Sequence, residues 1–262
     1  MIKYFRVYKT LLKLNLDTLL MYRANFFNNL IASVAWGLFS LFSIVLLTSN
    51  TKMVFGWSRD QLLLLNGLYG IIIGIYHVFL SANFERFSNV IHFGQLDSIL
   101  VKPIDSQFLL SFWLVRFATF SRVIIAGVYT WYISKGLHVT PTPVSVLSII
   151  IFMVFGLILL YSIWYTVITL TIWQTRLSNL TELMFSVTGI ARYPQEMLHQ
   201  LTNFVFVFLL PLTLIINIPA KVYLSRIDSP DAVWLLVLSV IFFVISRKFW
   251  KFALRFYTSA SN

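Results

Sequence analysis

Two residues of this chain have the types and the spacing of a catalytic pair. His92 and Asp97 form an H-x-x-x-x-D pattern, in which the histidine could act as a general base oriented by the carboxylate, as in lipid acyltransferases. No glycine- and arginine-containing block that would grip a phosphate follows the pattern, and a five-residue spacing often arises by chance. These two points argue against membrane acyltransfer, which is kept as an alternative function. Loss of activity in His92→Ala would identify it.

The other patterns that carry enzyme chemistry are absent from the sequence. There is no G-x-x-x-x-G-K-[ST] loop, no H-E-x-x-H, no nucleophile elbow and no cysteine. The chain therefore has no phosphate-binding loop with which to hydrolyse ATP itself. We expect no catalytic residue, no metal site and no cofactor bound by this chain.

A second group of candidates consists of polar residues inside apolar segments. Arg122 lies near the middle of one such segment, where an arginine costs about 2.5–3.5 kcal/mol, so it should face the helix bundle or a cavity. Glu182 is a possible partner. These residues could line a substrate pathway, or they could only join helices by hydrogen bonds and ion pairs. The candidates for a substrate pathway are Asn66, Tyr69, Tyr76, His77, Arg122, Glu182 and Phe185.

Composition indicates what kind of structure must position these residues. The chain of 262 residues is 59% hydrophobic and 11% charged, whereas a soluble domain carries about 25% charged residues. Its mean hydropathy is +0.83. Several uninterrupted apolar runs predict an all-α membrane protein with several spans and argue against a barrel, whose strands alternate apolar and polar residues. The net charge of +11 comes from basic residues at the chain ends and the edges of the apolar runs, which indicates contact with anionic lipid and not with nucleic acid.

The hydropathy pattern divides this single transmembrane domain into an interfacial helix and a series of spans. Residues 1–23 have a basic stripe opposite an apolar one, which is typical of a helix lying in the membrane plane. Residues 181–219 must cross the membrane once in net. Either 203–219 is the span, which its longer apolar run favours, or 179–193 is the span and 195–219 re-enters the membrane from the outer side. The remaining predicted spans are 26–47, 61–80, 111–133, 144–173 and 233–250.

Charge asymmetry predicts how the chain is oriented. The first 23 residues contain five basic residues, the last of them Arg23, and the end of the chain carries Arg247, Lys248, Lys251 and Arg255. Lys and Arg near span ends favour the cytoplasmic side. Both termini should therefore be cytoplasmic, which requires an even number of crossings, and six crossings place the 84–102 loop inside.

The 84–102 loop contains a short polar helix. Asp97 falls in the first turn, where it complements the helix dipole, and Pro103 ends the helix. Leu96, Ile99 and Leu100 form one apolar face. A helix this short is not stable alone, so it requires a surface to pack on, which could be a partner protein or the membrane.

Three stretches in order carry a resemblance to a known family: GWSRDQLLLLNGLYG (56–70), GQLDSILVKPIDSQF (94–108) and ARYPQEMLHQLTNFVFVFLLPLTLIINIPA (191–220). The chain resembles the permease subunits of type-2 ABC exporters, and more closely the viologen-exporter-type subfamily. It departs from that subfamily at 196–200, where Glu196, Met197, Leu198 and His199 stand in place of a second proline and a tryptophan.

The resemblance implies six spans, an N-terminal elbow helix, a cytoplasmic coupling helix in 84–102 and a re-entrant helix pair before the last span. It reverses the hydropathy preference, so 179–193 becomes the fifth span and 195–219 the re-entrant pair. The implied ATPase-coupling residues are Gln95, Leu96, Asp97, Ser98, Ile99, Leu100 and Lys102. The implied outer gate consists of Tyr193, Pro194, Pro211, Asn217 and Pro219.

The resemblance also implies a function. The chain would be the transmembrane subunit of an ATP-driven exporter in the cytoplasmic membrane of a prokaryote. Its partners would be cytosolic ABC ATPase subunits that bind ATP and Mg²⁺, a second homologous permease that forms a heterodimer with it, and membrane lipids. Amphipathic substrates are implied: cationic xenobiotics, peptides or lipids. A stand-alone secondary transporter or channel is the alternative, and it predicts transport without ATP.

Overall fold

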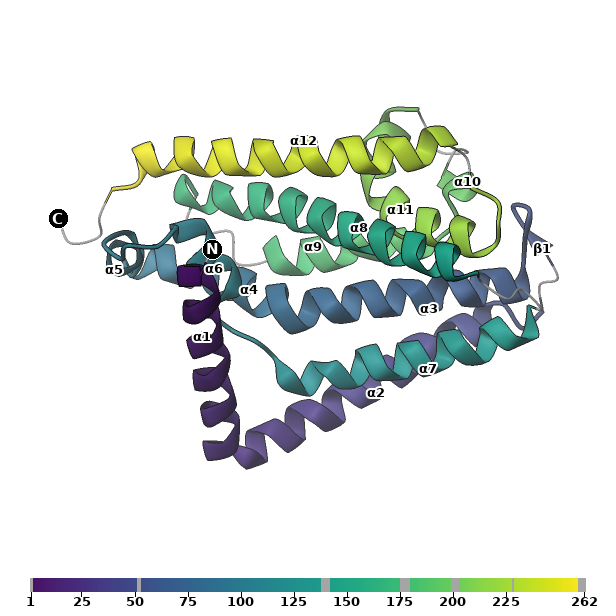
Figure 1. The fold of residues 1–262 in the computed structure, drawn as a ribbon, viewed down its shortest axis with the longest axis horizontal. Coiled ribbons are helices and arrows are strands. Elements are labelled where there is room, and N and C mark those ends of the chain that lie inside the picture. Colours follow the sequence, from purple (N-terminus) through teal and green to yellow (C-terminus); the bar gives the residue numbers. More distant parts are fainter. Residues whose placement is uncertain are drawn as a thin grey trace.

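The computed structural model describes residues 2–50, 53–137, 142–174, 180–198, 203–227 and 229–258. Most of the helices run along one long axis, and α1 lies across them at one end (Figure 1). The elements in chain order are α1 (Ile2–Met21), α2 (Arg23–Leu47), β1 (Met53–Val54), β2 (Trp57–Ser58), α3 (Arg59–Tyr76), the π-helical η1 (His77–Ser81), α4 (Ala82–His92), α5 (Leu96–Leu100), α6 (Ser106–Phe112), η2 (Phe117–Thr119), α7 (Phe120–Gly136), α8 (Pro143–Thr169), η3 (Leu170–Ile172), α9 (Leu180–Thr188), η4 (Gly189–Arg192), α10 (Gln195–Leu198), α11 (Asn203–Tyr223), α12 (Ser229–Ala253) and η5 (Leu254–Phe256).

Within the described ranges, four helices are long and apolar enough to cross a membrane: Arg23–Leu47, Arg59–His92, Pro143–Ile172 and Ser229–Phe256. A fifth candidate is the pair Ser106–Phe112 and Phe117–Gly136, whose two parts meet at 60°. The fold is therefore that of a helical membrane protein with several spans, as its composition predicts. The number six stays a prediction.

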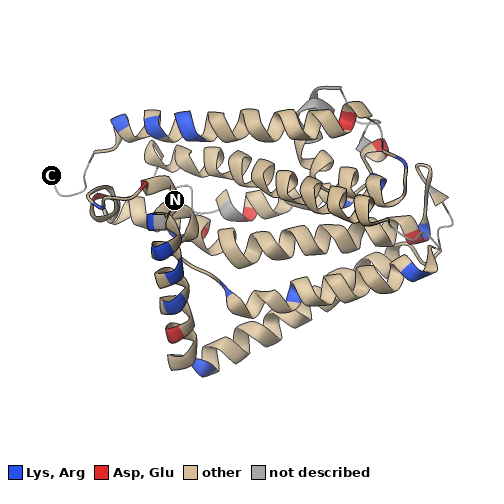
Figure 2. Ribbon diagram, viewed as in Figure 1, with Lys and Arg blue, Asp and Glu red and all other residues tan. Residues whose placement is uncertain are grey.

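The two ends of the bundle differ in charge, as Figure 2 shows. Lysines and arginines lie along α1 and in the C-terminal part of α12. Both segments lie on the same side of the bundle, which we call the α1 end. The opposite end, called the ribbon end, carries β1, β2 and α10 (Figure 1). The ribbon is a two-residue hairpin turned by Phe55 and Gly56, both with positive φ (49° and 81°), a geometry that matches the twist of paired strands.

The third predicted span, 111–133, is not one straight helix. α6 ends at Phe112, and the chain continues without helical structure to Arg116 before η2 and α7 resume it. Backbone groups freed by such a break need partners when no water is near. The amide of Arg116 donates to the carbonyl of Val78 in η1 at 2.9 Å. The altered hydrogen-bond pattern of a π-helical turn leaves this carbonyl accessible.

Two asparagines bind the rest of the broken segment. Asn83 of α4 accepts from and donates to the backbone of Leu114. Asn15 of α1 donates to the carbonyl of Trp113 at 2.9 Å and accepts from the amide of Val115 at 3.3 Å. The break is thus held from two other helices, which also fixes α1 against the bundle.

α3 and α7 approach each other closely because α3 has glycines on the facing side. A Cβ added at Gly70 would lie 2.9 Å from the Cβ of Ala126, and one at Gly74 would lie 2.8 Å from Cγ2 of Val123. Small residues at helix contacts let backbones pack closely, which is the main source of helix association within a membrane.

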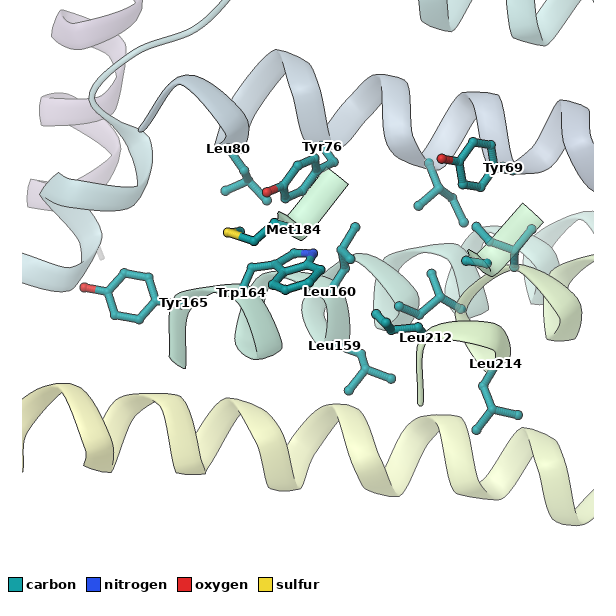
Figure 3. Close-up of a cluster of buried hydrophobic side chains, with 14 of the residues drawn as sticks. Tyr69, Tyr76, Leu80, Leu159, Leu160, Trp164, Tyr165, Met184, Leu212 and Leu214 are labelled. Atoms are coloured by element: carbon teal, nitrogen blue, oxygen red, sulfur yellow. The ribbon is translucent and has the colours of Figure 1, made fainter. Parts of the chain in front are cut away.

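The core lies where α8 packs against α11, α12 and the middle of α3. Figure 3 shows Met184 of α9 beside Tyr76 and Trp164, all of them buried. The indole of Trp164 donates to the hydroxyl of Thr188 at 3.0 Å. These contacts tie α9 to the bundle although it is short: the nine residues of α9 and the four of η4 rise only about 20 Å, against a hydrocarbon core of about 30 Å.

Candidate functional site

One face of α3 and the start of η1 line a cavity between α2 and the rest of the bundle. Asn66 and Tyr69 of α3 and His77 of η1 lie along this face, at intervals that return to the same side of a helix. The cavity has a volume of about 230 Å³ and is bounded by α2, α3, α7 and η4. We call it the α3 cavity.

Arg122 enters the α3 cavity from α7. Its Nε donates to the hydroxyl of Ser33 in α2 at 3.1 Å, and Ser121 donates to the same hydroxyl at 3.1 Å. The prediction that Arg122 faces the bundle or a cavity agrees with this position. The structure does not bring the predicted partner, Glu182, to Arg122. Glu182 is exposed at the start of α9, and none of the ion pairs among the described residues joins it to Arg122.

The remaining pathway candidates divide between the cavity and the core. Phe185 stacks on the ring of His77, with centroids 4.9 Å apart, so these two residues do meet at the α3 face. Tyr76 is 2% exposed and contacts Phe84 in the core instead. Successive residues of a helix point about 100° apart, which is why Tyr76 and His77 have different surroundings.

A further residue of the cavity is absent from the predicted set. Arg192 of η4 places its guanidinium 5.2 Å from the ring centre of Tyr69, and its Nε donates to the carbonyl of Gly189 at 3.0 Å. It belongs to the A-R-Y-P stretch, so a signal for it was present in the sequence. That signal was assigned to the outer gate through Tyr193 and Pro194 and not through the arginine.

Of the residues predicted as an outer gate, Asn217 meets the segment of Tyr193 and Pro194 at the ribbon end. The side chain of Asn217, fully buried in α11, accepts from the amide of Gln195 at 3.0 Å and donates to the carbonyl of Tyr193 at 3.2 Å. It thereby holds the segment around Pro194 against α11. Pro211 and Pro219 lie inside α11 itself.

A charged network adjoins that contact, and no motif in the sequence predicts it. Lys221, 7% exposed, lies 3.0 Å from Glu196 and 3.6 Å from Asp231 of α12. The indole of Trp57 donates to Glu196 at 3.0 Å. Burial alone would raise the pKa of Glu196, but a hydrogen bond to its own backbone and the contact with Lys221 hold that pKa below its usual range.

The predicted coupling helix lies at the α1 end, where α4 turns into α5 (Figure 1). Gly94 has a φ of +64° at this turn, a conformation that favours glycine. Leu96 and Ile99 are 0% and 3% exposed and pack into the chain's own core. This differs from the expectation that they face a partner, because the protein itself supplies the surface that the short helix needs.

The exposed side of this turn has a different set of residues. Phe93, Leu100 and Val101 are 67%, 38% and 81% exposed, and Gln95, Ser98 and Lys102 are exposed with them. We call this set the α5 surface. Behind it, Lys102 and Arg86 hold Trp113 between them, with their charged groups 4.5 and 4.8 Å from the ring centre.

An ion pair closes the α1 end between α6 and α12. Arg247 donates two hydrogen bonds to Asp105, one of them at 2.8 Å, and a third to Gln107 at 3.0 Å. Burial alone would raise the pKa of Asp105, but the bonds from Arg247 and from the amide of Phe108 outweigh that effect and lower it. Asp105 also caps α6 through Phe108.

Fold and site together describe a helical membrane protein with a polar cavity in its interior and a short helix at its basic end. The model of the ABC-2 family transporter proteins matches residues 34–261, so the chain belongs to that family of ABC transporter membrane components. Members of this family are not themselves catalytic and work with ABC ATPase partners. No curated protein and no solved structure matches the chain.

Proposed function

We propose that this chain is the permease subunit of an ATP-driven exporter in the cytoplasmic membrane of a prokaryote. It would move an amphipathic small molecule, peptide or lipid outward, while a separate subunit binds ATP and Mg²⁺. The observation that carries the proposal is the family match across residues 34–261. The polar cavity inside an otherwise apolar bundle supports it, because polar groups within a membrane commonly mark a substrate path.

The proposed topology places the α1 end and both termini in the cytoplasm. The basic residues on α1 and at the end of α12 support this side, and α1, lying across the bundle, fits an elbow helix (Figures 1 and 2). α9 with η4 would be the fifth crossing, and α10 with α11 would re-enter from outside. The two prolines inside α11 support the second assignment.

The proposed coupling surface is the α5 surface, with Phe93, Leu100 and Val101 as its apolar contacts. ATP-driven closure of the partner would push this surface, and the motion would pass along α4 and η1 into α3, which form one helix of 34 residues. The α3 cavity lies along that helix. At the ribbon end, separation of Glu196 from Lys221 would open the exit.

A second permease is part of the proposal. α2 has an apolar window of which only 6% is buried within the chain, so a face remains for lipid or for a homologous subunit in a heterodimer. The three quoted stretches also favour the viologen-exporter-type subfamily. That subfamily assignment does not decide the substrate.

Co-purification tests the proposal directly. The chain is expressed together with the ABC ATPase and any second permease encoded beside it, and a tag on this chain is used for capture. We expect a stable complex whose ATP hydrolysis drives outward transport in proteoliposomes. A chain that captures no ATPase and transports without ATP would instead be a secondary transporter or channel.

A further inference from the structure

The α3 cavity has a one-sided charge. Two of its lining residues, Arg122 and Arg192, carry guanidinium groups, and none of the described residues that line it is a carboxylate. Their contacts are neutral, namely Ser33 for Arg122 and Gly189 with the ring of Tyr69 for Arg192. Among the ion pairs of the described residues, none includes either arginine. Both arginines are half-buried, and removing an unpaired charge even partly from water is costly, so the cavity favours an anion.

The cavity also has an unused hydrogen-bond donor. Asn66 is 1% exposed, lines the cavity, and its Nδ2 has no partner among the described residues. An unsatisfied buried donor destabilises the folded protein. An acceptor bound in the cavity would remove that destabilisation, which makes Asn66 a second, independent indication of a ligand.

A larger cavity with many polar lining residues lies nearer the α1 end and adjoins the α3 cavity. It has a volume of about 760 Å³ and lies where α1 meets α2, beside the broken segment at 113–116. Trp36 and Arg122 line both cavities. Asn25, Asn29 and other polar groups line the larger one, and none of its described lining residues is a carboxylate. Arg116, which also lines it, forms an ion pair with Glu85. The two cavities therefore adjoin at Arg122, the residue that a route between them would pass.

A third cavity shows what a neutral lining looks like in this fold. It lies between α1, α6, α8 and α12 and has mostly apolar walls. Its charged residues are Asp105 and Arg247, which form an ion pair with each other. Unpaired arginines, Arg122 and Arg192, are thus a feature of the other two cavities and not of every cavity in this fold.

We propose that the route through the α3 cavity binds the anionic headgroup, phosphate or carboxylate, of a single-tailed amphiphile. Arg122 and the Nδ2 of Asn66 contact the headgroup, and Arg192 provides positive charge at the far end. An amphiphile is favoured over a free ion because Phe39, Leu41, Ile73 and Ile125 also line the cavity. This inference goes beyond the exporter function, because it concerns binding and does not require ATP.

The test measures binding to the full chain, with whichever subunits co-purify, in nanodiscs of zwitterionic lipid. The probe is radiolabelled dodecyl phosphate, and empty nanodiscs give the background. Dodecyltrimethylammonium and inorganic phosphate are the competitors. We expect saturable binding that neither competitor displaces at concentrations equal to that of the probe.

Variants assign the binding to the proposed residues. We expect Arg122→Gln to weaken binding about tenfold or more, since a hydrogen bond to a charged group contributes about 1.5–3 kcal/mol. Arg122→Lys should keep part of the affinity. The matched control is Arg255→Gln, which removes the same charge from an exposed position at the end of the chain's last helix.

Asn66→Leu separates a ligand contact from a structural role. Because the Nδ2 has no protein partner, this variant should weaken binding about tenfold while the melting temperature stays the same or rises. A lower melting temperature with unchanged binding would overturn the assignment of Asn66. The proposal as a whole is overturned if the cationic amphiphile or inorganic phosphate displaces the probe, or if Arg122→Gln binds as well as Arg255→Gln.

Discussion

Asn83 of α4 pairs with both backbone polar groups of Leu114, the residue in the middle of the break between α6 and α7. Its Oδ1 accepts from the amide of Leu114 at 2.8 Å, and its Nδ2 donates to the carbonyl of Leu114 at 2.9 Å. Asn83 itself is 2% exposed. One side chain thus takes the place of two hydrogen bonds that a continuous helix would have made with its own backbone.

Replacing Asn83 should destabilise the protein strongly. Asn83→Leu leaves an amide and a carbonyl unpaired in a buried position, and each such group costs about 1–3 kcal/mol. We expect a loss of about 2–5 kcal/mol in the free energy of unfolding, measured by denaturant titration in detergent. Asn89→Leu, on the exposed side of the same helix, is the control and should change little. Equal stability of the two variants would contradict this account of the break.

The α5 surface makes a prediction that distinguishes folding from coupling. Val101→Asp should leave the permease folded but lower ATP-driven transport several-fold, because Val101 is 81% exposed at the proposed contact with the ATPase. Leu96→Asp should instead lower the yield and melting temperature, because Leu96 is fully buried and an unpaired charge would enter the core. Transport and ATP hydrolysis are measured together in proteoliposomes, and a folded, active Leu96→Asp variant would show that the helix docks through its other face.

The close contact between α3 and α7 predicts a compensating pair of substitutions. Gly74→Ala places a methyl group 2.8 Å from Cγ2 of Val123, and overpacking of this kind costs about 1–3 kcal/mol. Val123→Ala in the same chain should recover most of the loss, which a double-mutant cycle measures as a coupling energy. Gly127→Ala in α7 is the control, since nothing lies within 4 Å of its added Cβ. Additive effects of the two substitutions would argue against the contact.

The ion pair between Asp105 and Arg247 predicts a pH dependence. The pKa of Asp105 is lowered in the folded protein, so the stability it contributes is present above the ordinary aspartate pKa of about 3.9. That contribution should be lost as the pH falls below about 4 through the folded-state pKa. Asp105→Asn should lower the melting temperature at neutral pH and flatten its decline in acid. Melting temperatures recorded between neutral pH and about pH 3 check this, and parallel curves for the two proteins would refute it.

The positions of most helices could be predicted from the sequence, because runs of apolar residues and the signals at Gly94 and Pro103 are local. The break at 113–116 could not, because Trp113, Leu114 and Val115 are as apolar as the helical residues around them and one arginine does not by itself end a helix. What causes it is the pairing with Asn15 and Asn83, which lie far away in the sequence. A hydropathy profile contains no information about such contacts.

The candidate site was predictable in part. Arg122, Asn66 and His77 are polar residues in apolar segments, and they do line one cavity. The burial of Leu96 was not predictable, since an apolar helix face fits a partner surface and the protein's own core equally well. Arg192 is not predictable as a cavity residue, because it lies at the end of a predicted span beside the gate residues Tyr193 and Pro194, and its contact with Tyr69 depends on how that segment folds back.

The π-helical turn η1 lies inside a helix of 34 residues, Arg59–His92, which rises about 51 Å from end to end. Such a turn adds to the spacing of the hydrogen bonds, and one residue more or fewer in a helix rotates all that follows by about 100°. The five residues of η1, HVFLS, therefore set the rotation of α4 about the helix axis. This rotation determines the direction in which Asn83 and the α5 surface point. Because of η1, the direction in which the side chains of α4 point does not follow from the direction in which those of α3 point.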